Sequence, residues 1–84
     1  MSSVDWRQIK YDEVFAQESL GLQRRREAEP HCKVEDIEAV LKNLYIMQGA
    51  DWEGRSDVVV ISMAASVAAH EHFIAEWKAE LRRN

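Results

Sequence analysis

The sequence has few of the residues on which disulfide-rich, collagen-like and many-stranded proteins depend. Its 84 residues include one cysteine, one proline and three glycines. A single cysteine excludes an intrachain disulfide and any zinc site that needs two or more cysteines. Scarce glycine and proline exclude collagen-like and low-complexity chains, and they disfavour a sheet of many strands, which needs many turns. Because the chain is short, residues 1–84 are treated as one domain.

The chain also lacks a strong charge of one sign, since 15 acidic and 11 basic residues give a formal net charge of −4. The acidic excess is spread along the chain, so no basic segment predicts nucleic-acid binding, which depends on clustered Lys and Arg. The N-terminal residues do not resemble a signal peptide. The longest apolar run, residues 58–69, is shorter than the roughly 18–20 residues needed to cross a bilayer. With one unpaired thiol, we expect a cytoplasmic protein without membrane contact.

What the sequence does contain is 46% hydrophobic and 31% charged residues, the proportions of a folded globular chain. Breaks at Glu29-Pro30 and at residues 49–54 divide it into three segments. Each segment is predicted as a helix, over residues 5–28, 34–48 and 57–83. We therefore predict an all-α fold, a three-helix bundle with a long, alanine-rich C-terminal helix.

The apolar pattern differs in quality among the three segments. In the first it is an imperfect stripe, weakened by a mid-helix Gly21, that consists of Ile9, Val14, Phe15, Leu20 and Leu22. In the second it has the three-and-four spacing of one buried face, formed by Val34, Ile37, Val40, Leu41, Leu44 and Met47. Gly49 is expected to end that helix as a left-handed cap. The third begins after Ser56 as N-cap, and residues 58–61 are predicted as helix, with a short strand as the alternative.

The third helix is too long and too apolar for the other two to cover. It would span about 40 Å, whereas a compact chain of this length is roughly 30 Å across. Ten of the twelve residues in 58–69 are apolar, which leaves no polar face for water. We therefore expect a homodimer, or a complex with another protein, packed through small residues of this helix: Ala64, Ala65, Ala68, Ala69, Ala75 and Ala79. The alternative is a monomer in which the first helix covers one side and an exposed alanine face the rest.

Two places carry residue types found in catalytic and metal sites. His70 and His72 are two residues apart, so a helix directs them to different sides and they cannot share a metal ion. No metal site is predicted, and His70 is interpreted as a partly buried imidazole near Ser66. Cys32 and its neighbour His31 precede the second helix, where the helix dipole favours a thiolate. They are candidates for a reactive thiol, and the alternative is that Cys32 is a small packing residue.

The segment between the second and third helices is the strongest candidate for recognition. Trp52 lies between Gly49 and Gly54, so a large rigid side chain is combined with a mobile backbone. Trp and Arg are enriched among the residues that dominate binding energy at interfaces. The candidate binding residues are Asp51, Trp52, Arg55 and His70. The alternative is that Trp52 folds back and fills the end of the bundle.

Apolar surface beyond the needs of one chain favours a small non-enzymatic interaction or assembly module. Its expected partner is another protein or a second copy of the chain. The alternative is a ligand-binding protein or accessory subunit of an enzyme that uses the loop of Trp52 and Arg55. An enzyme is disfavoured, because neither an oxyanion loop nor a third group to orient Cys32 and His31 is identifiable. No catalytic residue is assigned and no cofactor is expected.

Overall fold

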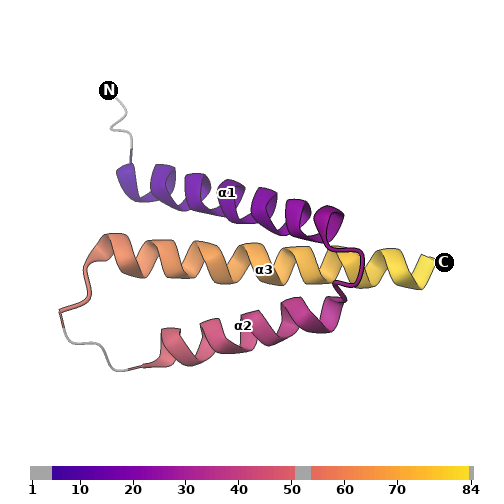
Figure 1. Cartoon of the computed structure of the whole chain (residues 1–84). Helices are drawn as coiled ribbons and strands as arrows, with labels where there is room; N and C mark the ends of the chain where they lie inside the picture. Colours follow the sequence, from indigo (N-terminus) through magenta and orange to yellow (C-terminus); the bar gives the residue numbers. More distant parts are fainter. Residues whose placement is uncertain (1–4, 51–53, 84) are drawn as a thin grey trace.

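The described parts of the chain form three helices, which confirms the all-α prediction (Figure 1). The computed structural model describes residues 5–50 and 54–83. Helix α1 covers Trp6–Ala28, α2 covers Val34–Gly49 and α3 covers Asp57–Arg83. The predicted boundaries differ from these by one residue at most.

Side-chain caps at two helix starts account for the places where α1 and α3 begin. Asp5 accepts a hydrogen bond from the Arg7 backbone N–H at 3.0 Å, which satisfies one free donor in the first turn of α1. Ser56 accepts one from the Val59 N–H at 3.3 Å, as predicted for an N-cap. Residues 58–61 are therefore helical, and the strand alternative is wrong.

The helix ends follow the predicted signals with one exception. Glu29 is extended at φ −114° and ψ 93°, because the ring of Pro30 disfavours the helical region for the residue before it. Gly49 is not a left-handed cap but the last residue of α2, and among the described residues the glycine with positive φ is Gly54, at 75°. The helix end is closed without a left-handed residue, because the Ala50 N–H donates to the Met47 carbonyl and the Arg55 guanidinium reaches the last carbonyls of α2.

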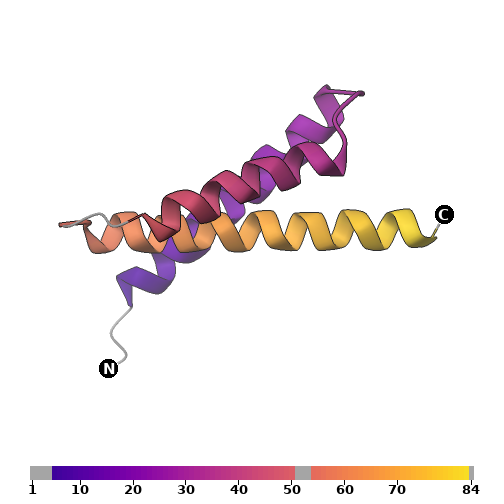
Figure 2. The ribbon, with the colours of Figure 1, turned by 90° about the horizontal axis from the view of Figure 1, so that it is seen from below.

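Helix α3 lies in the middle, and the other two helices pack against it on different sides (Figures 1 and 2). Helix α1 runs in the same direction as α3 and α2 in the opposite one. The backbones of α1 and α2 do not pack against each other. The molecule is consequently elongated, with extents of 47 × 35 × 22 Å and a radius of gyration of 14.8 Å, against about 12 Å for a compact chain of this length.

The hydrophobic core is small and lies toward the α1–α2 connection. Its buried members are Leu22, Val34, Ile37, Ile74 and Trp77, with Cys32, Leu41 and Phe73 packed against them. Three residues predicted to be on buried faces are instead exposed, namely Ile9 at 51%, Leu20 at 46% and Met47 at 42%. In α1 the reason is that the covered face, at positions 11, 14, 15, 18, 19 and 22, includes a glutamate and a serine. A prediction based on apolar residues alone therefore could not identify the covered face of α1.

The small residues of α3 are used partly inside the chain. Ala65 and Ala69 are fully buried, Ala64 and Ala68 are half-buried, and Ala75 is exposed. Small side chains in the middle of α3 let the flanking helices approach closely, so part of the alanine surface expected to bind a second chain is covered by α1 and α2.

By length and composition, α3 could also cross a membrane. A window of 18 residues has a mean hydropathy of 1.6 with at most two charged side chains. This window is longer than the apolar run of residues 58–69. It reaches past His70-Glu71-His72, where Phe73 and Ile74 raise the mean hydropathy again. A core helix of a soluble protein meets the same criteria, and 33% of this window is buried inside the chain. Hydropathy is therefore weak evidence for a membrane span.

Candidate interaction surface

Large exposed apolar side chains gather at one end of the molecule. Figure 1 shows that the start of α1, the end of α2 and the start of α3 are at the same end of the molecule, opposite the α1–α2 connection, with α1 and α2 on either side of α3. Eight of the ten large hydrophobic residues that are exposed in the described parts of the chain belong to these three helix ends. We call them the apolar end: Trp6, Ile9, Tyr45, Ile46, Met47, Val58, Val59 and Val60.

The first turns of α3 are uncovered around much of their circumference. Val58, Val59 and Val60 are 45%, 40% and 48% exposed. Consecutive helical residues point about 100° apart, so these three side chains sample about 200° of the helix surface. Farther along, most exposed positions of α3 are polar, as at Glu71 and Lys78, and Leu81 near the other end is a single exposed apolar side chain among charged residues.

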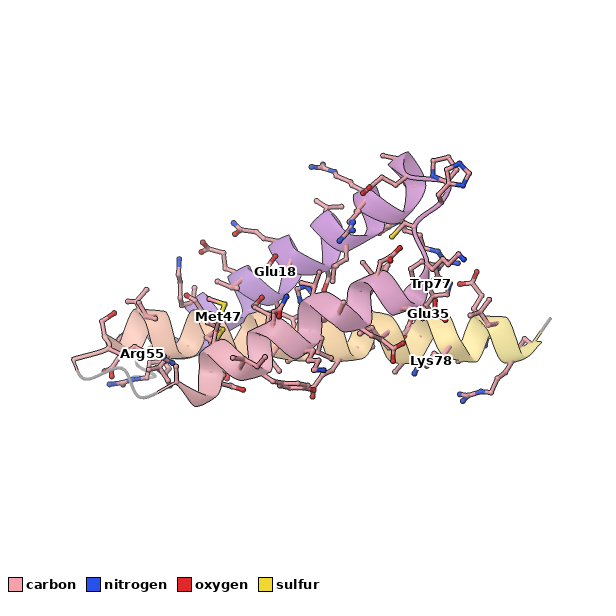
Figure 3. All side chains as sticks on the ribbon, turned by 60° about the horizontal axis from the view of Figure 1, so that its bottom comes forward. Glu18, Glu35, Met47, Arg55, Trp77 and Lys78 are labelled. Atoms are coloured by element: carbon pink, nitrogen blue, oxygen red, sulfur yellow. The ribbon has the colours of Figure 1, made fainter. Side chains whose placement is uncertain are left out.

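Two arginines at this end are held within the chain. Arg7 of α1 forms an ion pair with Asp57 of α3 at 3.4 Å. Arg55 donates hydrogen bonds to the carbonyl oxygens of Met47 and Ala50, at 3.2 and 3.5 Å (Figure 3). A cation at a helix C-terminus is stabilised by the partial negative charge of the free carbonyls. These contacts join the three helix ends around the apolar residues without leaving a strong net charge.

The opposite half of α3 is fixed to α1 by an arginine clasp. Both Nη atoms of Arg26 donate to the Glu80 carboxylate, at 2.9 and 3.1 Å, and its guanidinium carbon lies 4.0 Å from the centre of the Trp77 ring. The hydrogen bonds and positive charge of Arg26 lower the pKa of Glu80 below its usual value. The arrangement combines two-point recognition of a carboxylate with stacking on an aromatic face.

Helix α2 is joined to α3 by two polar contacts. Lys78 donates to Glu38 at 2.7 Å, and the hydroxyl of Tyr45 donates to Glu71. That hydrogen bond, with some desolvation and the negative charge of Glu71, raises the pKa of Tyr45 above its usual value. Glu38 and Tyr45 of α2 thus each bond to a side chain of α3, and these contacts hold α2 against α3.

A polar cluster is buried between α1 and α3. Ser66 is 7% exposed and donates its hydroxyl to the Glu18 carboxylate at 2.7 Å. His70 is 5% exposed, and its Nδ1 lies 2.7 Å from the Ser66 carbonyl oxygen. Because a carbonyl can only accept, the Nδ1 of His70 carries the proton in this contact. This agrees with the prediction of a partly buried imidazole near Ser66. Glu18 was not predicted as a partner, and what marks it is its position on the covered face of α1.

The predicted site residues are not brought into one site. Asp51 and Trp52 lie outside the described residues, and Arg55 is at the apolar end, while His70 is buried in the middle of α3. Cys32 is half-buried against the core, as expected of a packing residue, and its neighbour His31 is exposed. Within residues 5–50 and 54–83, no three His, Cys, Asp or Glu side chains are grouped so that they could hold a metal ion.

Two open grooves accompany the helix contacts. One, of about 570 Å³, lies between α1 and α3 and is lined by the Arg26–Glu80 clasp, Phe73 and Ser19. The hydroxyl oxygen of Ser19 is buried there without a hydrogen-bond partner. The other, of about 510 Å³, lies between α2 and α3 beside Tyr45. Both volumes are in the range of small-molecule sites, but their charged groups already bind one another across the helices.

Comparison with known proteins gives no relative on which to base a function. No family model, no curated protein and no solved structure matches the chain. The apolar end is therefore interpreted from its own chemistry.

Proposed function

We propose that the protein is a small non-enzymatic interaction module that binds another protein chain through the apolar end. One observation carries the proposal: the start of α1, the end of α2 and the start of α3 place eight large exposed apolar side chains at one end of the molecule. Apolar patches of this kind mark protein-binding surfaces, because water contact with them is unfavourable and burial against a partner removes it.

The composition of the apolar end supports the same conclusion. The apolar end contains the aromatic residues Trp6 and Tyr45 and the thioether of Met47. These three residue types are enriched in the centres of protein interfaces. The Arg7–Asp57 pair lies at its border and provides polar surface like that of an interface rim.

The proposal is tested by capture from native extract with the intact protein and two matched variants. Val59→Glu places a charge on the apolar end, whereas Leu81→Glu places the same charge on a comparably exposed residue near the other end of α3. Because a charge buried in an interface must lose its hydration, we expect Val59→Glu to abolish capture that Leu81→Glu retains. The bound proteins are quantified by mass spectrometry.

The comparison also controls for folding. A glutamate near the start of α3 is favourable to the helix dipole and one near its end is unfavourable, so the control is the more destabilising change. Circular dichroism checks that both variants remain helical. Equal recovery of every bound protein by all three forms would contradict the proposal. A Trp52→Ala variant tests in the same assay whether the loop contributes to recognition.

The alternative function, a ligand-binding or accessory subunit that uses the loop, has less support. Arg55, the cation that would bind an anionic ligand, donates to carbonyl oxygens at the end of α2. In that position, Arg55 stabilises the C-terminal end of α2. Thermal stabilisation by a metabolite that is lost in Arg55→Ala would favour this alternative.

The proposal places the module in the cytoplasm and away from the bilayer. It is supported by the contact of Ser66, in the apolar half of α3, with the Glu18 carboxylate of α1, which would have to break or enter hydrocarbon if α3 crossed a membrane. Recovery of the protein in the membrane fraction after cell disruption, resistant to carbonate washing, would contradict this location.

A further inference from the structure

We infer that the partner of the apolar end is a second copy of this chain, so that the protein is a symmetric homodimer joined at that end. The inference rests on the proposed function and names its partner. It differs from the dimer expected from the alanine residues of the third helix, because the uncovered surface lies at the helix ends, whereas Ala65 and Ala69 are buried within the chain.

The first argument is area. The chain exposes 6188 Å², whereas a compact monomer of 9.7 kDa exposes about 5,100 Å². The excess of roughly 1,000 Å² is close to the ~800 Å² that each partner buries in a standard stable interface. The elongated chain therefore has enough surface for an interface of the size that a stable dimer needs.

The second argument is complementarity of the surface with itself. At the apolar end the start of α3 is exposed around much of its circumference, and the last turns of α2 expose Tyr45, Ile46 and Met47. In a twofold dimer, the α3 start of each copy can pack on the α2 end of the other. Such an interface is closed, because residue i of one copy meets residue j of the other and the reverse contact follows by symmetry.

The third argument is charge. The Arg7–Asp57 pair and the Arg55 cap are completed within one chain, so two copies can meet without bringing a strong charge of one sign together. A nucleic acid or a strongly acidic peptide would find no basic cluster at this end among the described residues. A neutral, apolar and self-complementary surface favours a second copy over a charged partner.

The test is the mass of the purified full chain in solution. Multi-angle light scattering and sedimentation velocity are recorded between about 10 and 200 µM, because dimerisation depends on concentration. We expect the natural protein and Leu81→Glu to have twice the chain mass of 9.7 kDa. We expect Val59→Glu and Ile46→Glu to raise the dimer dissociation constant at least about thirtyfold, as for loss of a central interface residue.

Three outcomes separate the inference from the proposed function. A natural protein of single-chain mass at the highest concentration overturns the dimer; if Val59 then still governs capture from extract, the proposed function stands. A dimer that Leu81→Glu dissociates and Val59→Glu does not would overturn the inferred dimer, and the proposed function would fall with it only if Val59→Glu also left capture from extract unchanged. A dimer that neither variant affects overturns the inferred surface. Unchanged helical circular dichroism in all variants ensures that each loss reflects the interface and not unfolding.

Discussion

At the scale of single residues, two glycines of this chain, Gly21 and Gly54, have different structural roles. Gly21 lies in the middle of α1, is exposed and has no heavy atom within 4 Å of the position that a Cβ would take. Gly54 also has open space, but its φ of 75° is a conformation that other residues rarely adopt. The same residue type is therefore dispensable at one position and required at the other.

Replacing Gly21 with alanine is expected to stabilise the fold by about 0.5–1 kcal/mol, because alanine loses less backbone entropy in a helix. The matched change Gly54→Ala is expected to destabilise it, since a side chain with positive φ is strained. Urea unfolding followed by circular dichroism measures both free energies of unfolding. Stabilisation by Gly54→Ala, or destabilisation by Gly21→Ala, would contradict this assignment of roles.

The sequence predicts that His70 lies near Ser66, but it does not predict the contact of Ser66 with Glu18. Ser66 lies one helical turn before His70, so their proximity follows from the sequence of α3 alone. Glu18 lies 48 residues away from Ser66 in the chain. Its contact depends on how α1 packs against α3, which local spacing does not specify.

At the scale of elements, α3 is held by its neighbours through different contacts. The α1 side combines the Arg26–Glu80 clasp with the buried Glu18–Ser66 hydrogen bond. The α2 side is held by Lys78–Glu38 and by Tyr45, which donates to α3. The backbones of α1 and α2 do not pack against each other, and their side chains Leu22, Val34 and Ile37 share one hydrophobic core with α3.

The clasp is expected to make stability depend on pH at the acidic end. Arg26 lowers the pKa of Glu80 in the fold, so its contribution is present above the usual carboxyl range and is lost as pH falls through the folded pKa. Glu80→Gln should therefore lower the urea midpoint at about pH 7, and the difference from the natural protein should shrink at about pH 3.

Glu76→Gln is the matched control, because Glu76 is exposed on the adjacent turn and pairs with His72 within α3 itself. Its effect at neutral pH should be smaller than that of Glu80→Gln, since it joins no two helices. A difference between Glu80→Gln and the natural protein that stays the same from neutral to acidic pH would contradict the role of the clasp.

At the scale of the whole molecule, stability is expected to be uneven. The middle of α3 is covered by both flanking helices, and seven of its residues are buried, whereas α1 has one buried residue and α2 two. A helix covered on one side can detach while the rest remains folded, and such openings are faster than global unfolding.

Hydrogen exchange should reveal this difference in the Val59→Glu variant, which removes association from the measurement. We expect amides of residues 65–77 to exchange at least about tenfold more slowly than those of α1 and α2. Exchange is followed by mass spectrometry of peptides. Equal protection of all three helices would show that the chain unfolds as one cooperative unit and would contradict the expectation.

The sequence alone determined the number, type and approximate ends of the helices. Those features depend on neighbours in the chain: the Ser56 cap, the Glu29-Pro30 break and the long stretch of α3 without glycine or proline. It also indicated that α3 has more apolar surface than one short chain covers. Local propensity and periodicity act over a few residues, so a single sequence suffices to read them.

Only the tertiary structure decided where the surplus apolar surface lies. The middle of α3 is buried between the flanking helices, whereas the valines at its start remain exposed. Tertiary packing likewise placed Glu18 beside Ser66 and set Arg26 on Trp77. These contacts depend on helix direction and crossing, which arise from the summed fit of many side chains and are not encoded at any one position.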